Sequence, residues 1–390
     1  MLATGKKAPR HRRIGSVRLT SLVAMGLLAS GVAFSNAQSG PPGITDPTVL
    51  PPFDPGAPSC SKPAGLKKVL AFAQDNQREF MEGVARGLAR AAQDRGLEYR
   101  LVLANNDTSK QAEQLRLLLA SKVGGVVASP VDSASLARSL QQIIWAGAYV
   151  GTVVPPPATS LLNAPQYLTG KVLGDAAAAY IKDRLGGRAK VALLTQDSIE
   201  FLAPRFVAIR DSLKDLPGVT IVADISPSPV NKEGGMATMT TILLANPDVD
   251  VVLGADTVVL GALAAVRAAG KARPDQFLGG IDGEPEAVAE IKKGGTPYKI
   301  SVSLASPVFG YAMGQHAADW LAGKSVPQAM DILPRPLTKA NIARYEADLA
   351  DPAAVYADPA QRALYLKMYG NICYDTRDRY VNFPWSSESK

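Results

Sequence analysis

Residues Val69–Leu103 read VLAFAQDNQREFMEGVARGLARAAQDRGLEYRLVL, and the order of patterns within them predicts the architecture. The apolar runs Val69–Ala73 and Tyr99–Leu103 have the length and composition of strands. Between them, Met81–Gln93 carries apolar residues at the spacing of one helix face. Strand, helix and strand in this order predict two parallel strands, because the helix must carry the chain back across the face of the sheet.

The same alternation continues along the chain in two halves. Strands are expected at 125–128 and 149–154, and helices at 111–119 and 135–145. The triplet Pro155-Pro156-Pro157 interrupts the pattern, which then restarts. The second half is expected to form strands at 190–194, 219–223, 249–253, 277–281 and 298–304, and helices at 174–184, 205–214, 236–244, 258–269 and 286–292. We therefore predict an α/β fold with two doubly wound parallel-sheet lobes.

Three segments lie outside the two alternating regions. Residues 38–65 are rich in Pro, Gly and Ser, which predicts an extended or disordered leader. A helix is expected at 307–321, where Pro307 suits a first helical turn, and it can return the chain to the first lobe. Residues 331–390 contain several Tyr residues and predict a tail that packs on the lobes, with a helix at 359–369. The expected lobe boundaries are 66–156 plus 305–330 and 157–304.

The N-terminus has the pattern of a secretory signal peptide over residues 1–37. Six basic residues and the apolar run Leu19–Phe34 come before Ser35-Asn36-Ala37, so cleavage is expected after Ala37. A transmembrane anchor is disfavoured, because the uncharged run is short and contains Gly and Ser. Arg12-Arg13 lacks the apolar pair that follows the arginines of a twin-arginine signal. We expect an exported, periplasmic protein.

Most of the positive charge belongs to that signal. The whole chain has a formal net charge of +7, and removing the six basic residues of 1–37, a segment without acidic residues, leaves +1. A protein without surplus positive charge lacks the electrostatic footprint that binds phosphate backbones. Nucleic acid is therefore not an expected partner.

Histidine and cysteine are too few for the common catalytic and metal sites. Outside the signal the chain has one histidine, His316, and its two cysteines are Cys60 and Cys373. No G-x-S-x-G elbow occurs, and no glycine-rich phosphate loop follows the first strand. We therefore expect no enzyme activity, no metal and no cofactor. In an oxidising compartment the two cysteines are expected to form a disulfide, with two free buried thiols as the alternative.

Five features follow one another along the chain in a characteristic order and spacing: Gly87 and Gly96, Val126–Ser133, Gly254-Ala255-Asp256, Leu260–Leu263 and Gly279–Gly283. Together they resemble the type I periplasmic binding proteins, in particular the ribose-binding-like branch that serves sugar ABC transporters. The resemblance covers about residues 66–330 and implies two lobes joined by three crossing strands, with a ligand held between them. The crossings are expected near 154–157, 301–307 and 330. Closure of the lobes on the ligand would be a hinge motion.

Candidate ligand-binding residues follow the strands of both lobes, where ligands of open parallel sheets bind. The resemblance implies that Phe80 stacks on a sugar, that Arg205 supplies a guanidinium and that Asp282 is the carboxylate of an Asp-Gly turn. The structural alternatives are core packing for Phe80, a solvated charge for Arg205 and a helix cap for Asp282. The remaining candidates are Asp75, Asn76, Ser129, Asp132 and Asp256.

The sequence also departs from the ribose-binding pattern. Val154-Pro155 stands where ribose binders have an Asp-Arg pair, and Ala255 stands where they have a binding amide. Ser129 replaces an Asn, and Leu304 falls where a Gln is expected. Lost polar groups would leave hydroxyls of a buried sugar unpaired, which is costly. A less polar, modified or unusual small molecule therefore fits as well as a simple free aldose.

These observations predict a monomeric receptor that captures a sugar or sugar-like small molecule and delivers it to an ABC transporter permease. The alternative is a binding module that reports its ligand to a membrane receptor or sensor kinase, and the sequence does not separate the two. A repressor effector lobe shares this fold, but the export signal and the absent DNA-binding helix pair argue against it.

Overall fold

A computed structural model of the chain describes residues 40, 42–153 and 157–388. The signal peptide expected at 1–37 lies outside the described residues. Residues 39–390 form one compact unit, which contains two β-sheets. None of the helices in the described part of the chain is long and apolar enough to cross a membrane.

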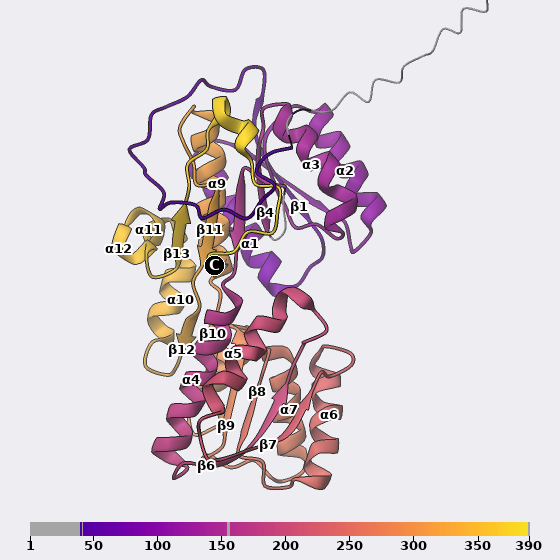
Figure 1. The fold of residues 1–390 in the computed structure, drawn as a ribbon, viewed down its shortest axis with the longest axis vertical. Helices are drawn as coiled ribbons and strands as arrows, with labels where there is room; N and C mark the ends of the chain where they lie inside the picture. Colours follow the sequence, from indigo (N-terminus) through magenta and orange to yellow (C-terminus); the bar gives the residue numbers. More distant parts are fainter. Residues whose placement is uncertain (1–39, 41, 154–156, 389–390) are drawn as a thin grey trace, which may run out of the picture. The chain divides into compact units, whose positions relative to one another are not determined.

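The first sheet has the strand order β13-β11-β5-β4-β3-β1-β2 (Figure 1). Neighbouring strands are parallel except for the pair β11 and β13. Two helix pairs, α1 with α9 and α2 with α3, cover the sheet. The strands are β1 (Lys67–Gln74), β2 (Glu98–Leu103), β3 (Val123–Ala128), β4 (Tyr149–Val153), β5 (Ser160–Asn163), β11 (Ala329–Ile332) and β13 (Leu366–Tyr369). The helices are α1 (Glu79–Asp94), α2 (Thr108–Ala120), α3 (Ser133–Trp145) and α9 (Ser306–Leu321).

The second sheet has the strand order β12-β10-β9-β8-β6-β7 and is parallel except for the pair β10 and β12. The helix pairs α4 with α5 and α6 with α7 cover it. The strands are β6 (Arg188–Leu194), β7 (Gly218–Ile225), β8 (Val251–Gly254), β9 (Phe277–Asp282), β10 (Tyr298–Ser303) and β12 (Arg335–Leu337). The helices are α4 (Gln166–Arg184), η1 (Glu200–Leu202), α5 (Ala203–Leu213), α6 (Lys232–Ala245), α7 (Asp256–Ala268) and α8 (Pro285–Lys293).

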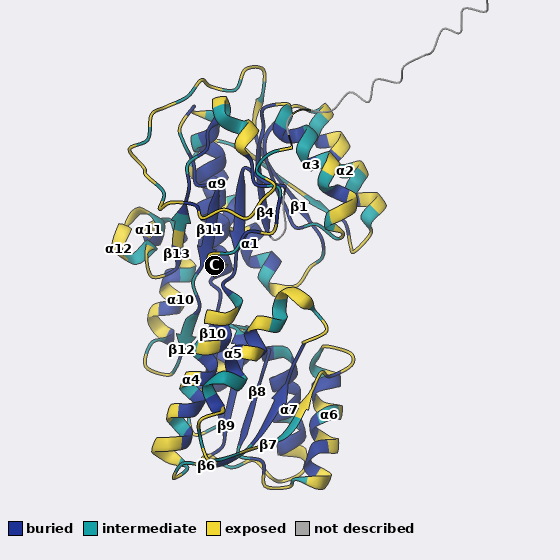
Figure 2. Ribbon diagram, in the orientation of Figure 1, coloured by how far each residue is buried: buried dark blue, intermediate teal, exposed yellow. Residues whose placement is uncertain are grey.

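The two sheets share one winding pattern, which confirms the predicted α/β fold with two doubly wound lobes. In each sheet the second strand of the lobe lies at one edge, and the chain then returns to place its third, fourth and fifth strands on the other side of the first. Helices cover both faces, so the central strands are buried along their length, as the dark blue strands of Figure 2 show. This burial explains their continuous apolar runs.

Three short connections join the lobes, and the first of them differs from the prediction. The chain crosses between β5 and α4, between β10 and α9, and between β11 and β12. The expected boundary at 156/157 assigned Ser160–Asn163 to the second lobe, whereas β5 pairs with β4 and β11 in the first sheet. The sequence pattern did not predict this strand. Neighbouring parallel strands are usually joined by a connection of a dozen or more residues, whereas only six residues separate β4 from β5. Val154, Pro155 and Pro156 lie outside the described residues.

The C-terminal tail contacts both lobes. After β12, helix α10 (Ile342–Ala350) packs beside the second sheet, where Tyr345 contacts the Ser303 hydroxyl. Helix α11 (Pro352–Ala357) packs on α9, and α12 (Pro359–Arg362) leads into β13 of the first sheet. The helix predicted at 359–369 is wrong in its second half, because Leu366–Tyr369 pairs with β11 as a strand. The tail continues through η2 (Tyr374–Arg379).

The leader is extended and attached to the tail. Ile44 forms an isolated β-bridge with Val381, and Pro52 forms one with Tyr369. Cys60 and Cys373 form a disulfide with a Cα–Cα distance of 6.1 Å. A small separate core joins leader, tail and first sheet; its members are Leu50, Ala158, Leu161, Ala329, Tyr369, Val381, Phe383 and Trp385. The two ends of the described chain thus stabilise each other on the first lobe.

Candidate functional site

The carboxyl edges of the two sheets face the hinge. Strands β5, β10 and β11 all end where the chain crosses to the other lobe, and the linkers that follow them are two residues long. Loops at these edges present side chains and helix N-termini, which makes them the usual binding edge of an open parallel sheet. The candidate residues lie in these loops, at the end of a strand that leads into them, or in the first turn of a helix that follows them.

The loop after β1 presents an ion pair and two free acceptors. Arg78 donates from its guanidinium to Asp75 Oδ2 at 2.9 Å, and the Asp75 side chain is only 8% exposed. Asp75 Oδ1 and Gln74 Oε1 are buried and accept no hydrogen bond from any described residue. Buried acceptors of this kind normally have a partner, so the loop retains capacity for hydroxyl donors.

Phe80 and Asn76 flank this ion pair. Phe80 is the second residue of α1, and its half-buried ring packs against the main core. Asn76 donates to Asn106 Oδ1 at 2.9 Å and thereby ties the loop after β1 to the loop after β2. The ring of Phe80 thus serves core packing and keeps part of its surface exposed.

Two further candidates of the first lobe have structural partners. Asp132 is the N-cap of α3 and accepts from the Ser135 amide at 2.7 Å. This backbone hydrogen bond lowers the pKa of Asp132. Ser129 is 2% exposed, and its carbonyl accepts from Gln111 at 2.9 Å. The exposed carboxylate of Asp132 is therefore engaged at a helix terminus, a role that was not predicted from the sequence.

Arg205 and Asp282 meet in the second lobe. Arg205 lies in the first turn of α5, is 4% exposed and donates from Nε to Gln166 Oε1 at 2.9 Å. Its guanidinium is 3.8 Å from Asp282 Oδ1, and the Asp282 side chain remains 36% exposed. Burial lowers the pKa of Arg205, and the charge of Asp282 opposes this. The pair offers a fixed donor group beside an accessible acceptor.

Asp256 lies beneath this turn and is engaged by the protein. It is fully buried, and its carboxylate accepts from Tyr298 at 2.7 Å and from Ser301 at 2.6 Å. It also accepts from the Glu284 amide at 2.8 Å. Burial raises the pKa of Asp256 to about 6. The structure places Asp256 as a support for the Asp282–Glu284 turn, with both oxygens already hydrogen-bonded.

Charges of the two lobes influence one another at this edge. Burial raises the pKa of Asp282, whereas the guanidiniums of Arg205 and Arg78 oppose the rise. Burial also raises the pKa of Glu284 to about 7, and among the carboxylates that add to it is Glu79 of α1. Arg78 and Glu79 belong to the first lobe and the other three to the second, so the two halves of the candidate site lie within electrostatic reach.

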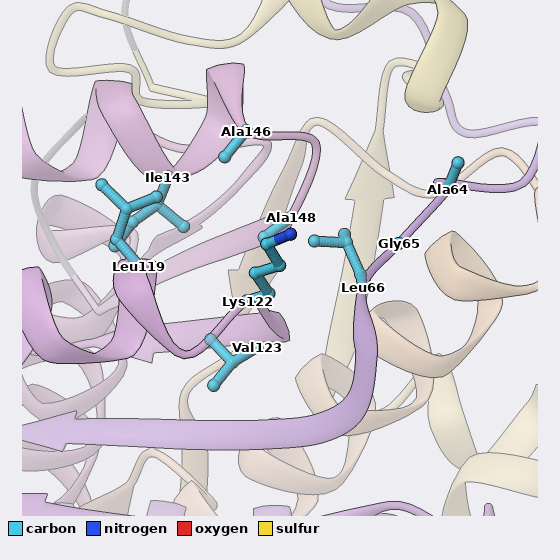
Figure 3. A pocket seen from close by; sticks show the side chains of 9 residues that line it. All are labelled: Ala64, Gly65, Leu66, Leu119, Lys122, Val123, Ile143, Ala146 and Ala148. Atoms are coloured by element: carbon cyan, nitrogen blue, oxygen red, sulfur yellow. The ribbon is translucent and has the colours of Figure 1, made fainter.

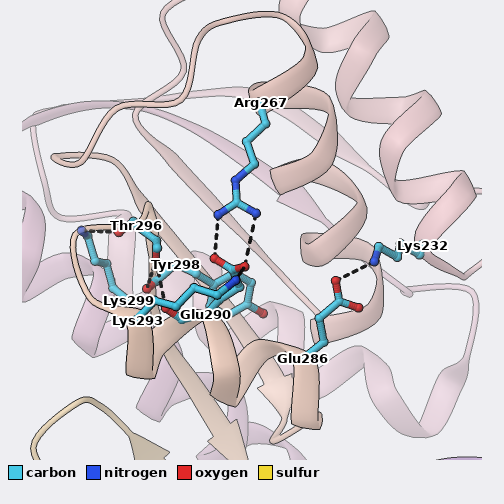
Figure 4. Close-up of polar contacts among 8 residues, drawn as sticks. All are labelled: Lys232, Arg267, Glu286, Glu290, Lys293, Thr296, Tyr298 and Lys299. Carbon is cyan, nitrogen blue, oxygen red and sulfur yellow. Dashed lines mark hydrogen bonds and ion pairs between the residues drawn. The ribbon is translucent and has the colours of Figure 1, made fainter.

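Ion pairs fix helix α8, which begins directly after this turn. Arg267 of α7 binds Glu290 at 2.6 Å, and Lys293 binds the same carboxylate at 2.6 Å (Figure 4). Lys232 of α6 binds Glu286 at 2.6 Å. The contacts of Arg267 and Lys232 hold α8 against α7 and α6, whereas the Lys293 contact lies within α8, and together they limit the freedom of the turn that carries Asp282.

A family model described as periplasmic binding protein domain matches residues 69–325. The chain belongs to the periplasmic binding protein family. Members of this family are solute-binding proteins rather than enzymes, and they act in the periplasm or outside the cell. The match ends before β11, so the C-terminal tail lies beyond it.

Curated relatives of this family member include import binding proteins. The ribose import binding protein of Bacillus subtilis is 29% identical over 264 residues, which cover 64% of this chain and 80% of that protein. A putative rhizopine-binding protein of Rhizobium meliloti is 24% identical over 262 residues, covering 64% of this chain and 83% of that protein.

Solved structures support the fold. An ABC transporter solute-binding protein of Bacillus halodurans, with bound myo-inositol, superposes with a TM-score of 0.61 and 22% identity, covering 72% of this chain and 98% of that one. A periplasmic ribose ABC transporter protein of Conexibacter woesei gives a TM-score of 0.62 and 22% identity, with 74% and 97% covered.

Two pockets have no candidate residue in their lining. The first, of about 280 Å³, is lined mainly by apolar side chains beside the residues that begin β1 and β3, including Leu66, Lys122 and Val123 (Figure 3). It therefore lies at the amino edge of the first sheet. The second, of about 380 Å³, lies between α8 and α10 beside Tyr345, and its lining includes Gly283, the residue that follows Asp282 at the carboxyl edge of the second sheet. Among the described residues no group of three His, Cys, Asp or Glu side chains is arranged to hold a metal ion.

Three polar residues of the site were not predicted from the sequence. Arg78 and Glu284 stand in the same loops as Asp75 and Asp282, so their position after a strand was the available signal. Gln166 had no signal, because it contacts Arg205 across 39 residues of sequence. Conversely, Asp256 and Asp132 were proposed as ligand contacts, and the structure gives both a hydrogen-bonded protein role.

Proposed function

We propose that this protein is an exported monomeric receptor that captures a sugar or sugar-like molecule between its lobes and delivers it to the permease of an ABC transporter. The observation that supports the proposal most is the pairing of Arg205 and Asp282 at the carboxyl edge of the second sheet. It is the kind of fixed donor and acceptor pair that binds neighbouring hydroxyls of a sugar.

The loop after β1 would supply the complementary half of the site. Asp75 Oδ1 and Gln74 Oε1 are free acceptors, and a sugar hydroxyl is a donor that satisfies them. The exposed part of the Phe80 ring would pack against the apolar face of the sugar. A ligand that contacts both loops has more partners when the lobes are closed, so binding shifts the hinge toward the closed form.

The buried neighbours of the site argue for a ligand with fewer or modified hydroxyls. Ser129, Ala255 and Leu304 are 2%, 3% and 5% exposed, and two of these three side chains offer no hydrogen bond. A hydroxyl facing Ala255 or Leu304 would lose its water without gaining a partner. We therefore expect deoxy or O-methyl sugars to bind better than a simple aldose of equal size.

The first test is a binding screen of the chain from Gln38 onward. D-ribose, D-allose, D-apiose and myo-inositol would be compared with their deoxy and O-methyl derivatives by thermal shift, followed by calorimetric titration. A bound ligand raises the melting temperature by mass action. Failure of every sugar and polyol to bind, together with binding of an amino acid or peptide, would refute the proposal.

Alanine variants locate the site once a sugar is found. Arg205→Ala and Asp282→Ala are each expected to weaken its affinity at least tenfold, because charged hydrogen bonds contribute about 1.5–3 kcal/mol. Arg188→Ala is the matched control, since Arg188 is an exposed arginine at the opposite end of β6. Unchanged affinity in both site variants would remove this edge from the binding site.

A further inference from the structure

The end of the tail lies over the first crossing between the lobes. Asn163, the last residue of β5, donates to Asp331 at 2.7 Å and to the Ser387 hydroxyl at 3.4 Å. The next residue, Glu388, reaches the other side of the crossing and contacts the start of α4. Two consecutive tail residues therefore contact the two lobes on either side of the linker between Asn163 and Gln166.

Glu388 supplies a cap that α4 lacks in its own sequence. The residue before the helix is Pro165, which has no side-chain acceptor. One oxygen of Glu388 accepts from the Leu168 amide at 2.8 Å, and the other accepts from the Tyr167 amide at 3.1 Å. A carboxylate at this position satisfies free helix amides and interacts favourably with the helix dipole.

The first turns of α4 hold Arg205 from two sides. Gln166, the residue directly before Tyr167, accepts from Arg205 Nε at 2.9 Å. One turn later, Gly170 packs against the backbone of Arg205 so closely that a Cβ at this position would lie 1.7 Å from the Arg205 carbonyl oxygen. Displacement of this part of α4 would therefore move the guanidinium away from Asp282.

We propose that Glu388 is a positioning residue of the binding site. It fixes the first turn of α4, and through Gln166 it fixes the direction of Arg205 toward Asp282. Because Ser387 contacts Asn163 of the first lobe, the same tail segment also links the two lobes at the first crossing. The inference concerns the geometry of Arg205, and its consequence for affinity rests on the proposed function.

Hydrogen exchange tests the positioning without any ligand. In Glu388→Ala, the amides of 166–170 and of 203–208 are expected to exchange about two- to fivefold faster, which is the factor expected for loss of a helix cap. Glu388→Gln, which keeps one acceptor oxygen, is expected to lie between Ala and the unaltered protein. Glu346→Ala is the control, because Glu346 is a tail carboxylate that binds Lys292 of the same lobe at 2.9 Å. Unchanged exchange in both segments would overturn the proposal.

A double-mutant cycle separates positioning from mere tail attachment. With D-ribose or myo-inositol as the probe, Glu388→Ala and Gln166→Ala are each expected to weaken binding about two- to fivefold, and the double variant no more than the stronger single one. Additive losses would contradict action through Gln166. If the unaltered protein binds neither probe nor any other sugar, the proposed function fails, whereas the exchange experiment still decides the role of Glu388.

Discussion

Asp282 is held by backbone geometry as well as by charge. Its φ of 121° lies in the region that side chains other than glycine rarely adopt. The next amide, that of Gly283, donates to the Ser301 hydroxyl at 3.0 Å, and Ser301 in turn donates to Asp256. Unfavourable backbone conformations persist where the surroundings enforce them, and they concentrate at functional sites. This turn therefore presents its carboxylate in one direction before any ligand arrives.

His316 makes the stability of the protein sensitive to acid. It is 2% exposed in α9, packs beside Tyr356, and neither ring nitrogen has a hydrogen-bond partner among the described residues. Burial lowers the pKa of His316 to about 4, with Asp319 opposing and Arg362 adding to the effect. The unfolded chain binds this proton near pH 6.5. The contribution of neutral His316 is thus full above pH 6.5 and is lost as the pH falls toward 4.

The comparison of His316→Gln with the unaltered protein measures this contribution. The free energy of unfolding of the unaltered protein is expected to fall by about 3 kcal/mol more between pH 7 and pH 4 than that of the variant, since one pKa unit equals about 1.36 kcal/mol. Urea unfolding at several pH values provides the measurement. Parallel pH profiles for the two proteins would contradict the buried neutral state. The difference between the two proteins removes the contribution of Asp256 and Glu284, whose raised pKa values of about 6 and about 7 lie in the same pH range.

At the level of elements, the apolar patterns predicted most strands and helices and failed for two short strands, β5 and β13, which are strands because they pair with β11. The run at 69–73 became β1, and the helix at 111–119 became α2 with longer ends. Strand β5 is only four residues long and comes shortly after three prolines, so the sequence shows no apolar periodicity that would identify it as a strand. In the tail, the pairing of Leu366–Tyr369 with β11 overrides the helical pattern at 359–369.

The candidate site shows the same division. Arg205 and Asp282 could be proposed because each follows a predicted strand, and the structure brings them to 3.8 Å. Gln166 and Glu388 could not, because hydrogen bonds across 39 and about 220 residues leave no local pattern. Residues that support a binding residue from a distant part of the chain are the ones that a single sequence does not reveal.

Helices α1 and α9 pack through glycines, which gives a test at the level of elements. A Cβ on Gly310 would lie 2.2 Å from the Val84 carbonyl oxygen, and one on Gly87 would lie 2.1 Å from that of Pro307. Because these neighbours are backbone atoms, Gly310→Ala is expected to force the helices apart and to cost about 1–3 kcal/mol of unfolding free energy. The midpoint urea concentrations of the variant and the unaltered protein would measure this loss. Arg86→Ala on the exposed face of α1 is the control, with an expected loss below about 1 kcal/mol. Equal losses would argue against close packing here.

At the level of the whole molecule, the leader and tail extend the first lobe and connect it to the second. The tail runs from β11 in the first sheet to β12 in the second, returns through α11 and β13 to the first, and ends at α4 of the second. The passage from β11 to β12 is the third of the crossings expected of the family, and the return through α11 and the contact with α4 are connections beyond those three. Hinge motion in this protein therefore has to move the tail together with the lobes.

The disulfide is expected to stabilise this arrangement. Cys60 and Cys373 are separated by 313 residues, so their bond restricts a long loop of the unfolded chain. Replacing both by Ser is expected to lower the free energy of unfolding by about 2–5 kcal/mol. Thermal unfolding of the double variant measures the change, and the unaltered protein in reducing agent should match it. If oxidised and reduced protein melted together, the bond would have no stabilising role.

The antiparallel strands that the tail adds have a further consequence. Strand β13 is the outer strand at one side of the first sheet, and the leader pairs with it at Pro52 and Phe53, whereas β12 is the outer strand at one side of the second sheet and is only three residues long. Free strand edges are templates for association with other copies of a chain. The remaining outer strands are β2, where Leu101 is exposed beside the charged Glu98 and Arg100, and β7, where two apolar residues, Ile221 and Ile225, are exposed. Aggregation of this protein is therefore expected to begin at β7.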